Sequence, residues 1–329
     1  MGTLTGVSYT DFASRLGPDN KIAKIIELLA QTNPLIEDLI AVEGNLPTGH
    51  KTTIRAGLPA VTWRLLNYGV QPSKSVSSQI TDTCGMLEAY AEVDKALADL
   101  NGNTAAWRLS EDRAFLEAMN QAEATTFVYG SVLTYPERFT GIEPRYATTG
   151  TDPEVSTYNT VSAYSSASGA DQTSMLLVVH GENTVHGIYP KGSVAGFQHQ
   201  DLGEQTLLDA ANGRYQGYRS HYKWDNGLTV RDWRYCVRIC NIDTSAITTT
   251  TVDVISAMID AYERIPDIGM GTPVYYANRT VRTWLWKQAR ESGKYMLSPM
   301  QVEGKPVLKF MEIPIKRLDA LVNTESVVS

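Results

Sequence analysis

The longest helical pattern in the chain spans residues 109–129, and it limits the possible folds more than any other feature. At a rise of ~1.5 Å per residue, it predicts a helix roughly 30 Å long, enough to serve as the backbone of a domain. Ser110 is placed to cap the first turn, where Glu111 and Asp112 favour the positive end of the helix dipole. Gly130 ends the helix. The face that we expect to pack carries Phe115, Met119, Ala122 and Thr126.

The second half of the chain mixes strand and loop patterns. Residues 147–174 are rich in Ser, Thr, Ala and Gly, and they predict an exposed loop or linker. Residues 175–180 form a continuous apolar run typical of a buried strand, and we expect residues 185–189 to be its hairpin partner. Residues 229–242 alternate strictly and predict one strand. One face of that strand carries Trp233, Tyr235, Val237 and Ile239, and the other carries Arg234, Cys236, Arg238 and Cys240.

The remaining patterns complete a mixed fold. Helices are predicted over residues 251–264 and from an Asn278 cap to about residue 290, with a strand over residues 274–277 between them. The C-terminal stretch predicts strands at residues 307–310 and 313–315. Pro314 favours an edge position, because proline cannot donate a hydrogen bond to the sheet. The expected fold class is α+β.

Two segments near the N-terminus carry apolar side chains that nothing in their own segment can cover. The first, an arm through about residue 46, holds a short amphipathic helix built on Ile22, Ile25, Ile26 and Leu29. The second, residues 51–66, alternates like two strands broken by Gly57-Leu58-Pro59 and predicts a projecting hairpin. A short helix and an isolated hairpin are each marginally stable in water, so we expect both to pack on another part of the chain or on another subunit.

Charge and apolar content exclude several classes of protein. A net charge of −7 argues against broad binding of nucleic acid through overall basicity. The chain is 43% hydrophobic and 20% charged, as in a globular protein, and no apolar run approaches the ~18 residues of a membrane span. The N-terminus lacks the pattern of a secretory signal, which favours a cytoplasmic location. Cys84, Cys236 and Cys240 fit no disulfide framework, and the last two are expected to be buried or half-buried thiols.

Common catalytic motifs are missing from the chain. Neither G-x-x-x-x-G-K-[ST] nor G-x-G-x-x-G after a strand occurs, and G-x-S-x-G and H-E-x-x-H are also absent. A metal site could be imagined from His180, His186 and His199 together with Asp201. Their spacing fits no standard zinc pattern, so polar hairpin residues are the favoured interpretation. We therefore expect no catalytic residue, cofactor or metal.

Basic and aromatic residues are interleaved between Arg214 and Arg238, a pattern that can signal nucleic-acid binding. The alternation is strict and the chain is acidic, so we favour an aromatic sheet face whose arginines form salt bridges to neighbouring subunits. Residues 77–100 predict a polar strand that leads into a short acidic helix. This acidic run offers a candidate counter-surface, with Glu88, Glu92, Asp94 and Asp99.

Several short motifs, taken in order, resemble the major capsid proteins of tailed double-stranded-DNA bacteriophages, in a podovirus-type branch. Each motif alone is weak, and their order along nearly the whole chain carries the resemblance. The motifs are GNLPTGH (44–50), WRLLN (63–67), LNGNTAA (100–106), HGIYPKG (186–192), GMG (269–271), YANRT (276–280) and IPI (313–315).

The resemblance implies a structural protein with the tailed-phage capsid fold, in four parts. Residues 1–46 would be the N-terminal arm, and residues 47–82 the extended hairpin loop that lies over a neighbouring subunit. Residues 83–173 and 296–329 would form the peripheral domain with its long spine helix, and residues 174–295 the axial domain.

The resemblance also implies partners. The chain would assemble with itself into the hexamers and pentamers of an icosahedral virion shell, in the host cytoplasm, and enclose packaged double-stranded DNA without sequence-specific binding. A scaffolding protein, a portal and a cement or decoration protein would be further partners, and the shell would mature from a procapsid. From the unpartnered segments and the arginine pattern, the expected inter-subunit contacts are Ile22, Ile26, Leu29, Lys51, Arg55, Trp63, Arg64, Arg234 and Arg238.

Three alternatives remain open at the level of sequence. A nanocompartment shell of the same fold, like an encapsulin, would carry enzymes rather than DNA. A hydrolase could assemble Ser, His and Asp side chains from distant positions, with His180, His186, His199 and His221 as the available bases. A DNA-binding module built on residues 214–238 would show a steep salt dependence of its affinity.

Overall fold

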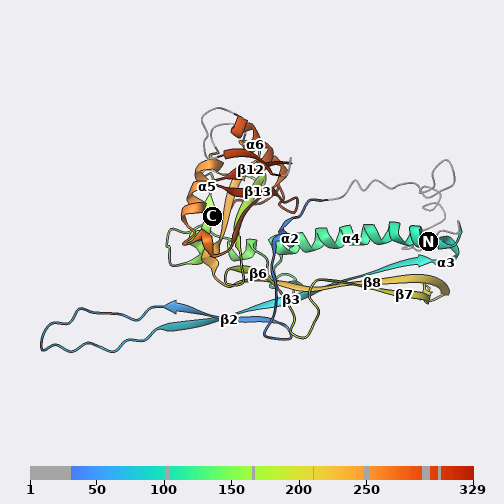
Figure 1. Ribbon diagram of the computed structural model, residues 1–329, viewed down its shortest axis with the longest axis horizontal. Coiled ribbons are helices and arrows are strands. Elements are labelled where there is room, and N and C mark those ends of the chain that lie inside the picture. Colours follow the sequence, from blue (N-terminus) through green and yellow to red (C-terminus); the bar gives the residue numbers. More distant parts are fainter. Residues whose placement is uncertain are drawn as a thin grey trace.

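The computed structural model describes residues 31–100, 104–164, 167–209, 211–247, 252–290, 297–302 and 305–329. The helix expected around Ile22 to Leu29 therefore lies outside the described residues. Figure 1 shows three parts: a body of sheet and helices, a stem in which a long helix lies along long strands, and a ribbon that projects away from both. We define the ribbon as residues 49–81. The stem comprises α3 (Lys95–Ala98), α4 (Thr104–Tyr129), β7 (Phe197–Leu208), β8 (Arg214–Val230) and the part of β3 (Val76–Asp94) that follows residue 81.

The body is built around β5, whose nine residues are all buried. It lies between two antiparallel neighbours, β9 and β10. Met175, Leu177 and Val179 face the core beneath the two body helices, while Leu176 and Val178 face a second core on the other side of the sheet. The elements are β4 (Thr160–Ser162), β5 (Gln172–His180), β9 (Cys236–Asp243), α5 (Val254–Glu263), β10 (Thr272–Ala277) and α6 (Arg279–Arg290).

Strands from the C-terminus extend the body sheet. β13 (Ile313–Arg317) pairs in parallel with β10 and antiparallel with β12 (Lys305–Phe310), which in turn pairs with β11 (Leu297–Val302). The expected strands are confirmed, but the edge position predicted from Pro314 is wrong, because β13 has a neighbour on each side. Proline is tolerated there because pairing with β10 begins only at Ile315.

The stem brings together segments far apart in the sequence. β3 (Val76–Asp94) pairs antiparallel with β8 (Arg214–Val230), which also pairs with β7 (Phe197–Leu208). α4 (Thr104–Tyr129) runs along these strands in Figure 1, and Met119 packs against Ala91 and Tyr222. α3 (Lys95–Ala98) closes the far end with Trp107. The long helix is confirmed, but it begins before Ser110, which lies inside the helix and does not cap it.

The remaining elements join these parts. α2 (Leu35–Asp38) packs into the second core. β1 (Ala41–Glu43) pairs with β6 (Val185–Tyr189), and β6 also pairs antiparallel with β8. Short 3-10 turns occur at η1 (Glu143–Arg145), η2 (Ser156–Asn159), η3 (Trp233–Tyr235) and η4 (Ile268–Met270). In the described part of the chain, no helix is both long enough and apolar enough to cross a membrane.

The ribbon differs from the predicted hairpin in its second strand. β2 (Gly49–Gly57) pairs with β3, from Gly49 opposite Thr83 to Gly57 opposite Val76. The predicted return strand at residues 61–65 is wrong, since residues 58–65 carry no strand and the chain returns only at Val76. The alternation of Val61, Trp63 and Leu65 was taken for a strand face, but all three side chains are exposed.

Three further local predictions are wrong. The predicted acidic helix is reduced to α3, because residues 88–94 belong to strand β3, which pairs with β8 from Cys84 to Asp94. The segment 229–242 is not one strand, since Asp232 accepts a hydrogen bond from Arg234 N and holds a turn at η3. β6 meets β5 at a single bridge and pairs instead with β8 and β1.

The expected loop over residues 147–174 is also only partly correct. Its residues 160–162 form β4 against β9, and β5 begins at Gln172, with Thr173 and Ser174 already buried. Strand β4 is too short for a periodic pattern to reveal. The expected division into domains separates β3 from β8, whereas the structure pairs them, and it separates β13 from β10, which also pair.

Candidate assembly surfaces

The ribbon exposes an unusual number of large apolar side chains. Trp63 is fully exposed, and the other exposed members are Leu58, Val61, Leu65, Leu66, Tyr68, Val70 and Val76. A contiguous apolar surface of this kind marks a site of interaction, because water covers it at a cost in free energy. Few contacts hold the loop in place, among them a hydrogen bond from Ser73 Oγ to Ala60 O at 2.6 Å.

The ribbon is also basic. Between Gly49 and Thr81 it carries four cations, Lys51, Arg55, Arg64 and Lys74, and neither Asp nor Glu. Since the whole chain carries −7 and the ribbon +4, the remainder carries −11. None of the four cations forms an ion pair with a described carboxylate. The ribbon is therefore apolar and positively charged on an otherwise acidic subunit.

The root of the ribbon is fixed to the rest of the molecule. Buried Asp82 accepts a hydrogen bond from Arg145 Nη2 at 2.7 Å, and the same nitrogen reaches the carbonyl oxygens of Thr140 and Leu228 at 3.2 Å. Gly49 is required here, because a Cβ at this position would lie 2.0 Å from the Asp82 carbonyl oxygen. The ribbon is thus anchored at one end and uncovered along its length.

Two cations of the basic and aromatic segment in β8, Arg219 and Lys223, pair with carboxylates of the same chain. Arg219 Nε donates to Glu92 Oε1 across the strand pair at 2.8 Å, and Lys223 lies 2.9 Å from Asp225. In the stem, Arg108 pairs with Asp201 at 2.5 Å. The acidic residues between Glu88 and Asp99 were expected to pair with arginines of a neighbouring subunit. Glu92 does pair with an arginine, but that arginine is Arg219 on β8 of the same chain. Cations already paired in this way offer little to a DNA backbone.

Arg238 is expected at a subunit contact, and the structure contradicts this. Its side chain is 1% exposed, since both faces of β9 are covered. The guanidinium donates to Glu143 Oε1 at 3.0 Å, to Glu325 Oε2 at 2.9 Å and to Ser174 Oγ at 3.0 Å. Arg238 therefore connects the body sheet to η1 and to the C-terminal segment through hydrogen bonds and ion pairs within the subunit. Strict alternation predicted an outward face, but the rest of the subunit covers both faces of β9.

The other predicted contact residues are accessible or lie beyond the description. Lys51, Arg55, Trp63 and Arg64 lie on the ribbon. Arg234 is half exposed and pairs with Asp232 at 2.7 Å within its own turn. Ile22, Ile26 and Leu29 fall outside the described residues. The contact role of all of these stays a prediction.

The histidines do not gather into one site. His180 Nε2 lies 2.8 Å from Tyr276 Oη, which donates to Asp38 Oδ2 at 2.6 Å, and burial lowers the pKa of His180 to about 4. His199 instead stacks on Tyr222 with ring centroids 4.9 Å apart. Among the described residues, no group of three His, Cys, Asp or Glu side chains could hold a metal ion.

The thiols on β9 are free and buried. Burial raises the pKa of Cys236 to about 12 and that of Cys240 to about 11, so both stay protonated at neutral pH. This agrees with the prediction of buried thiols made from sequence.

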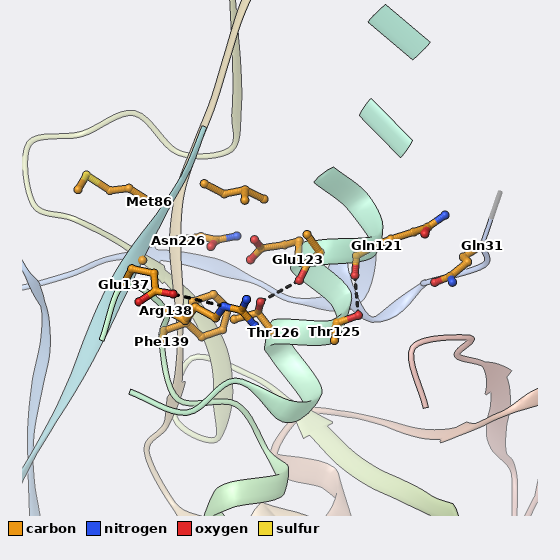
Figure 2. Close-up of a pocket in the computed structure, with 13 residues that line it drawn as sticks. Gln31, Met86, Gln121, Glu123, Thr125, Thr126, Glu137, Arg138, Phe139 and Asn226 are labelled. Carbon is orange, nitrogen blue, oxygen red and sulfur yellow. Dashed lines mark hydrogen bonds and ion pairs between the residues drawn. The ribbon is translucent and has the colours of Figure 1, made fainter. Parts of the chain in front are cut away.

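A pocket that the sequence did not indicate lies between α4 and the β3–β8 pair (Figure 2). Its volume is about 500 Å³, and Glu123 of α4 faces Asn226 of β8 across it. Glu123 had no sequence signal of its own, because one acidic residue among many on a long helix is usually exposed.

Two comparisons with known proteins cover nearly the whole chain. The family model described as major capsid protein GP7 matches residues 17–329. A chain in the near-atomic structure of bacteriophage Epsilon15 is 38% identical, with all of this chain and 98% of that chain covered and a TM-score of 0.77. No curated protein sequence matches the chain.

More distant structures carry no weight for function. The capsid of bacteriophage JBD30 is 10% identical, with 89% and 93% of the two chains covered and a TM-score of 0.47. An encapsulin from Synechococcus elongatus is 10% identical, with 67% and 93% covered and a TM-score of 0.40. The Epsilon15 likeness confirms the expected mixed capsid fold and favours the phage interpretation over the nanocompartment. The chain belongs to the family of bacteriophage major capsid proteins described by GP7, structural proteins that form the multimeric icosahedral shell of the virion and are not enzymes.

Proposed function

We propose that the subunits form hexamers and pentamers in which the ribbon of one copy lies over a neighbouring copy. The observation that carries this proposal is the ribbon itself, which is apolar, basic and uncovered in a subunit whose remainder is acidic. Burial of its apolar side chains stabilises a contact by about 25 cal/mol per Å², and this gain exists only between subunits. Many such contacts add up in a closed shell.

We assign the parts of the subunit to the peripheral and axial domains by their strand pairing. The stem would serve as the peripheral domain, with α4 as its spine helix, and the part of the body around β5, α5 and α6 as the axial domain near the symmetry axes. This revises the boundaries expected from sequence, because β7 and β8 go with the stem and β13 with the body.

The shell would enclose double-stranded DNA without binding it in a sequence-specific way. The acidic remainder of the subunit and the internal pairing of Arg219 and Lys223 in β8 support this. A wall that held DNA tightly through many cations would impede packing and release. The resemblance to tailed-phage capsids alone supports a scaffolding protein, a portal and a cement protein as further partners, an N-terminal arm that contacts other subunits, maturation from a procapsid, and assembly in the host cytoplasm.

A variant that lacks most of the ribbon tests whether the ribbon is needed for shell assembly. Arg55 pairs with Ser77, so residues 56–76 can be replaced by Asn-Gly, a two-residue turn that closes such a hairpin. We expect a subunit that unfolds within about 2 °C of the unchanged protein, since the ribbon is uncovered, but that forms no shells by electron microscopy.

A second variant separates the ribbon's side chains from its length. It keeps the same number of residues between Arg55 and Ser77 but replaces them with Gly and Ser, and it should also fail to assemble. Shells formed in normal yield by the shortened variant would contradict the proposal.

A further inference from the structure

The pocket between α4 and the β3–β8 pair holds a carboxyl group without a counter-ion. Glu123 is 2% exposed, and no described group forms a hydrogen bond with its Oε1 atom. Its contact with the Asn226 side chain favours the charged form, but burial outweighs it and raises the pKa of Glu123 to about 7. In Figure 2 the side chain points across the pocket toward Asn226. A buried carboxylate is costly unless a cation or several donors reach it.

The described part of the subunit supplies no cation to this group. Arg138 lines the same pocket, but its guanidinium lies 4.0 Å from Glu137 and 4.5 Å from the centroid of the Tyr135 ring. The hydroxyl groups of Thr125 and Thr126 donate to backbone carbonyl oxygens of their own helix. The pocket therefore holds one carboxyl oxygen, Glu123 Oε1, that receives no hydrogen bond from the described residues, and it has space for a donor.

The ribbon has the complementary shortage. Its four cations, Lys51, Arg55, Arg64 and Lys74, lack a carboxylate partner, as described above. In Figure 1 the ribbon extends away from the stem of its own subunit, so its outer part does not reach its own pocket. Lysine and arginine side chains carry a charge at the end of a long flexible stem, the shape that reaches a buried acceptor through a partly open pocket.

We propose that the pocket around Glu123 receives a lysine or arginine side chain from the ribbon of a neighbouring copy. This inference rests on the proposed docking of the ribbon and names the site that fixes it. The apolar side chains of the ribbon provide most of the buried area, while one charge-assisted hydrogen bond to Glu123 sets its register. Such bonds to a desolvated carboxylate are stronger than neutral ones and demand defined geometry.

The test compares Glu123→Gln with Glu137→Gln in the full chain. Both variants replace a carboxyl group that lines the same pocket with an amide, but the Glu137 side chain is exposed. Glu123→Gln keeps the shape of the side chain and should leave the melting temperature of the free subunit unchanged or higher. We expect it to raise the threshold subunit concentration for shell formation at least about tenfold, and Glu137→Gln to change it less than about twofold.

Four further variants identify the donor: Lys51→Met, Arg55→Met, Arg64→Met and Lys74→Met. For the residue that enters the pocket, the variant alone should raise the threshold as Glu123→Gln does, and the double variant should be no worse than either single one. A cryo-EM map of the shell should then show its ammonium or guanidinium group within about 4 Å of the Glu123 carboxylate.

Two outcomes would overturn the site without touching the docking of the ribbon. One is an unchanged threshold for Glu123→Gln while ribbon removal still abolishes shells. The other is strictly additive effects between Glu123→Gln and all four ribbon variants, which would assign the pocket to a different donor. Shells that form normally without the ribbon would instead overturn the proposed function itself.

Discussion

The ribbon and the body use similar residues in opposite ways. β5 in the body is buried along all nine of its residues, because β9 and β10 flank it and helices cover its faces. The ribbon strands have only each other, and the loop between them leaves Trp63 fully exposed. Apolar side chains in the body therefore stabilise the subunit, whereas those in the ribbon can stabilise only a contact with another molecule.

Charge follows the same division. In the body, Arg238 is enclosed by Glu143 and Glu325, so its charge is balanced inside the subunit. In the ribbon, which contains neither Asp nor Glu, none of the four cations forms an ion pair with a described carboxylate. Among the described residues, β5 and Arg238 of the body are therefore covered and paired within the subunit, whereas the apolar side chains and cations of the ribbon are not.

The largest effect on the body should come from Arg238→Met. The variant leaves Glu325, which is itself buried, without its guanidinium, and a broken buried ion pair costs about 3–5 kcal/mol. We expect the midpoint of urea unfolding to fall sharply, with assembly lost only because folded subunits are lost. Arg234→Met is the matched control, since Arg234 is half exposed and should change stability by less than about 1 kcal/mol. Equal stability of the two variants would break the comparison.

The pH dependence of stability should show a smaller effect, with opposite signs in the stem and the body. Burial raises the pKa of Glu123 from an ordinary value of 4.5 to about 7, so the folded subunit holds this proton longer than the unfolded chain. Stability from this group is complete below about pH 4.5 and falls by about 3 kcal/mol as the pH rises to about 7. Urea unfolding between pH 5 and 8 measures the fall, which Glu123→Gln should remove.

His180 in the body provides the opposite slope. Burial lowers its pKa from 6.5 to about 4, so stability is complete above about pH 6.5 and is lost as the pH falls toward 4. The Glu123→Gln variant should retain this acid-side loss, which serves as an internal control. A variant that also lost the acid-side slope would show that a general change in charge, and not Glu123, was measured.

The smallest effect on the subunit should come from Trp63→Ser in the ribbon. The side chain is fully exposed, so stability should change by less than about 0.5 kcal/mol, while shells form less readily. Trp107→Ser in the stem is the matched control. Trp107 is buried in α4, and its loss should cost about 3 kcal/mol or more. Unfolding curves and light scattering on the same samples separate the two properties, and a large loss of stability for Trp63→Ser would falsify the view of the ribbon as uncovered.

Errors made from sequence cluster where a distant neighbour decides the structure. The run from Glu88 to Asp94 contains good helix formers, yet it is a strand because β8 pairs with it along its length. Val61 to Leu65 alternates like a strand, but no strand pairs with it and its side chains are exposed. The local preference for helix or strand is worth tenths of a kcal/mol per residue, so pairing with a neighbouring strand outweighs it. Where no strand is available to pair, an alternating sequence does not form a strand.

The sequence by itself determined the elements whose signal is local: the long helix α4, the body helices α5 and α6, the buried strand β5 and the capping Asn278, whose Oδ1 accepts from Val281 N at 2.9 Å. Its ordered motifs also placed it near the phage capsid proteins. Only the tertiary structure decided that β3 pairs with β8, that Arg238 is enclosed and that Glu123 faces an open pocket. Periodicity records which side chains avoid water, but the identity of the covering segment depends on contacts between residues far apart in the chain.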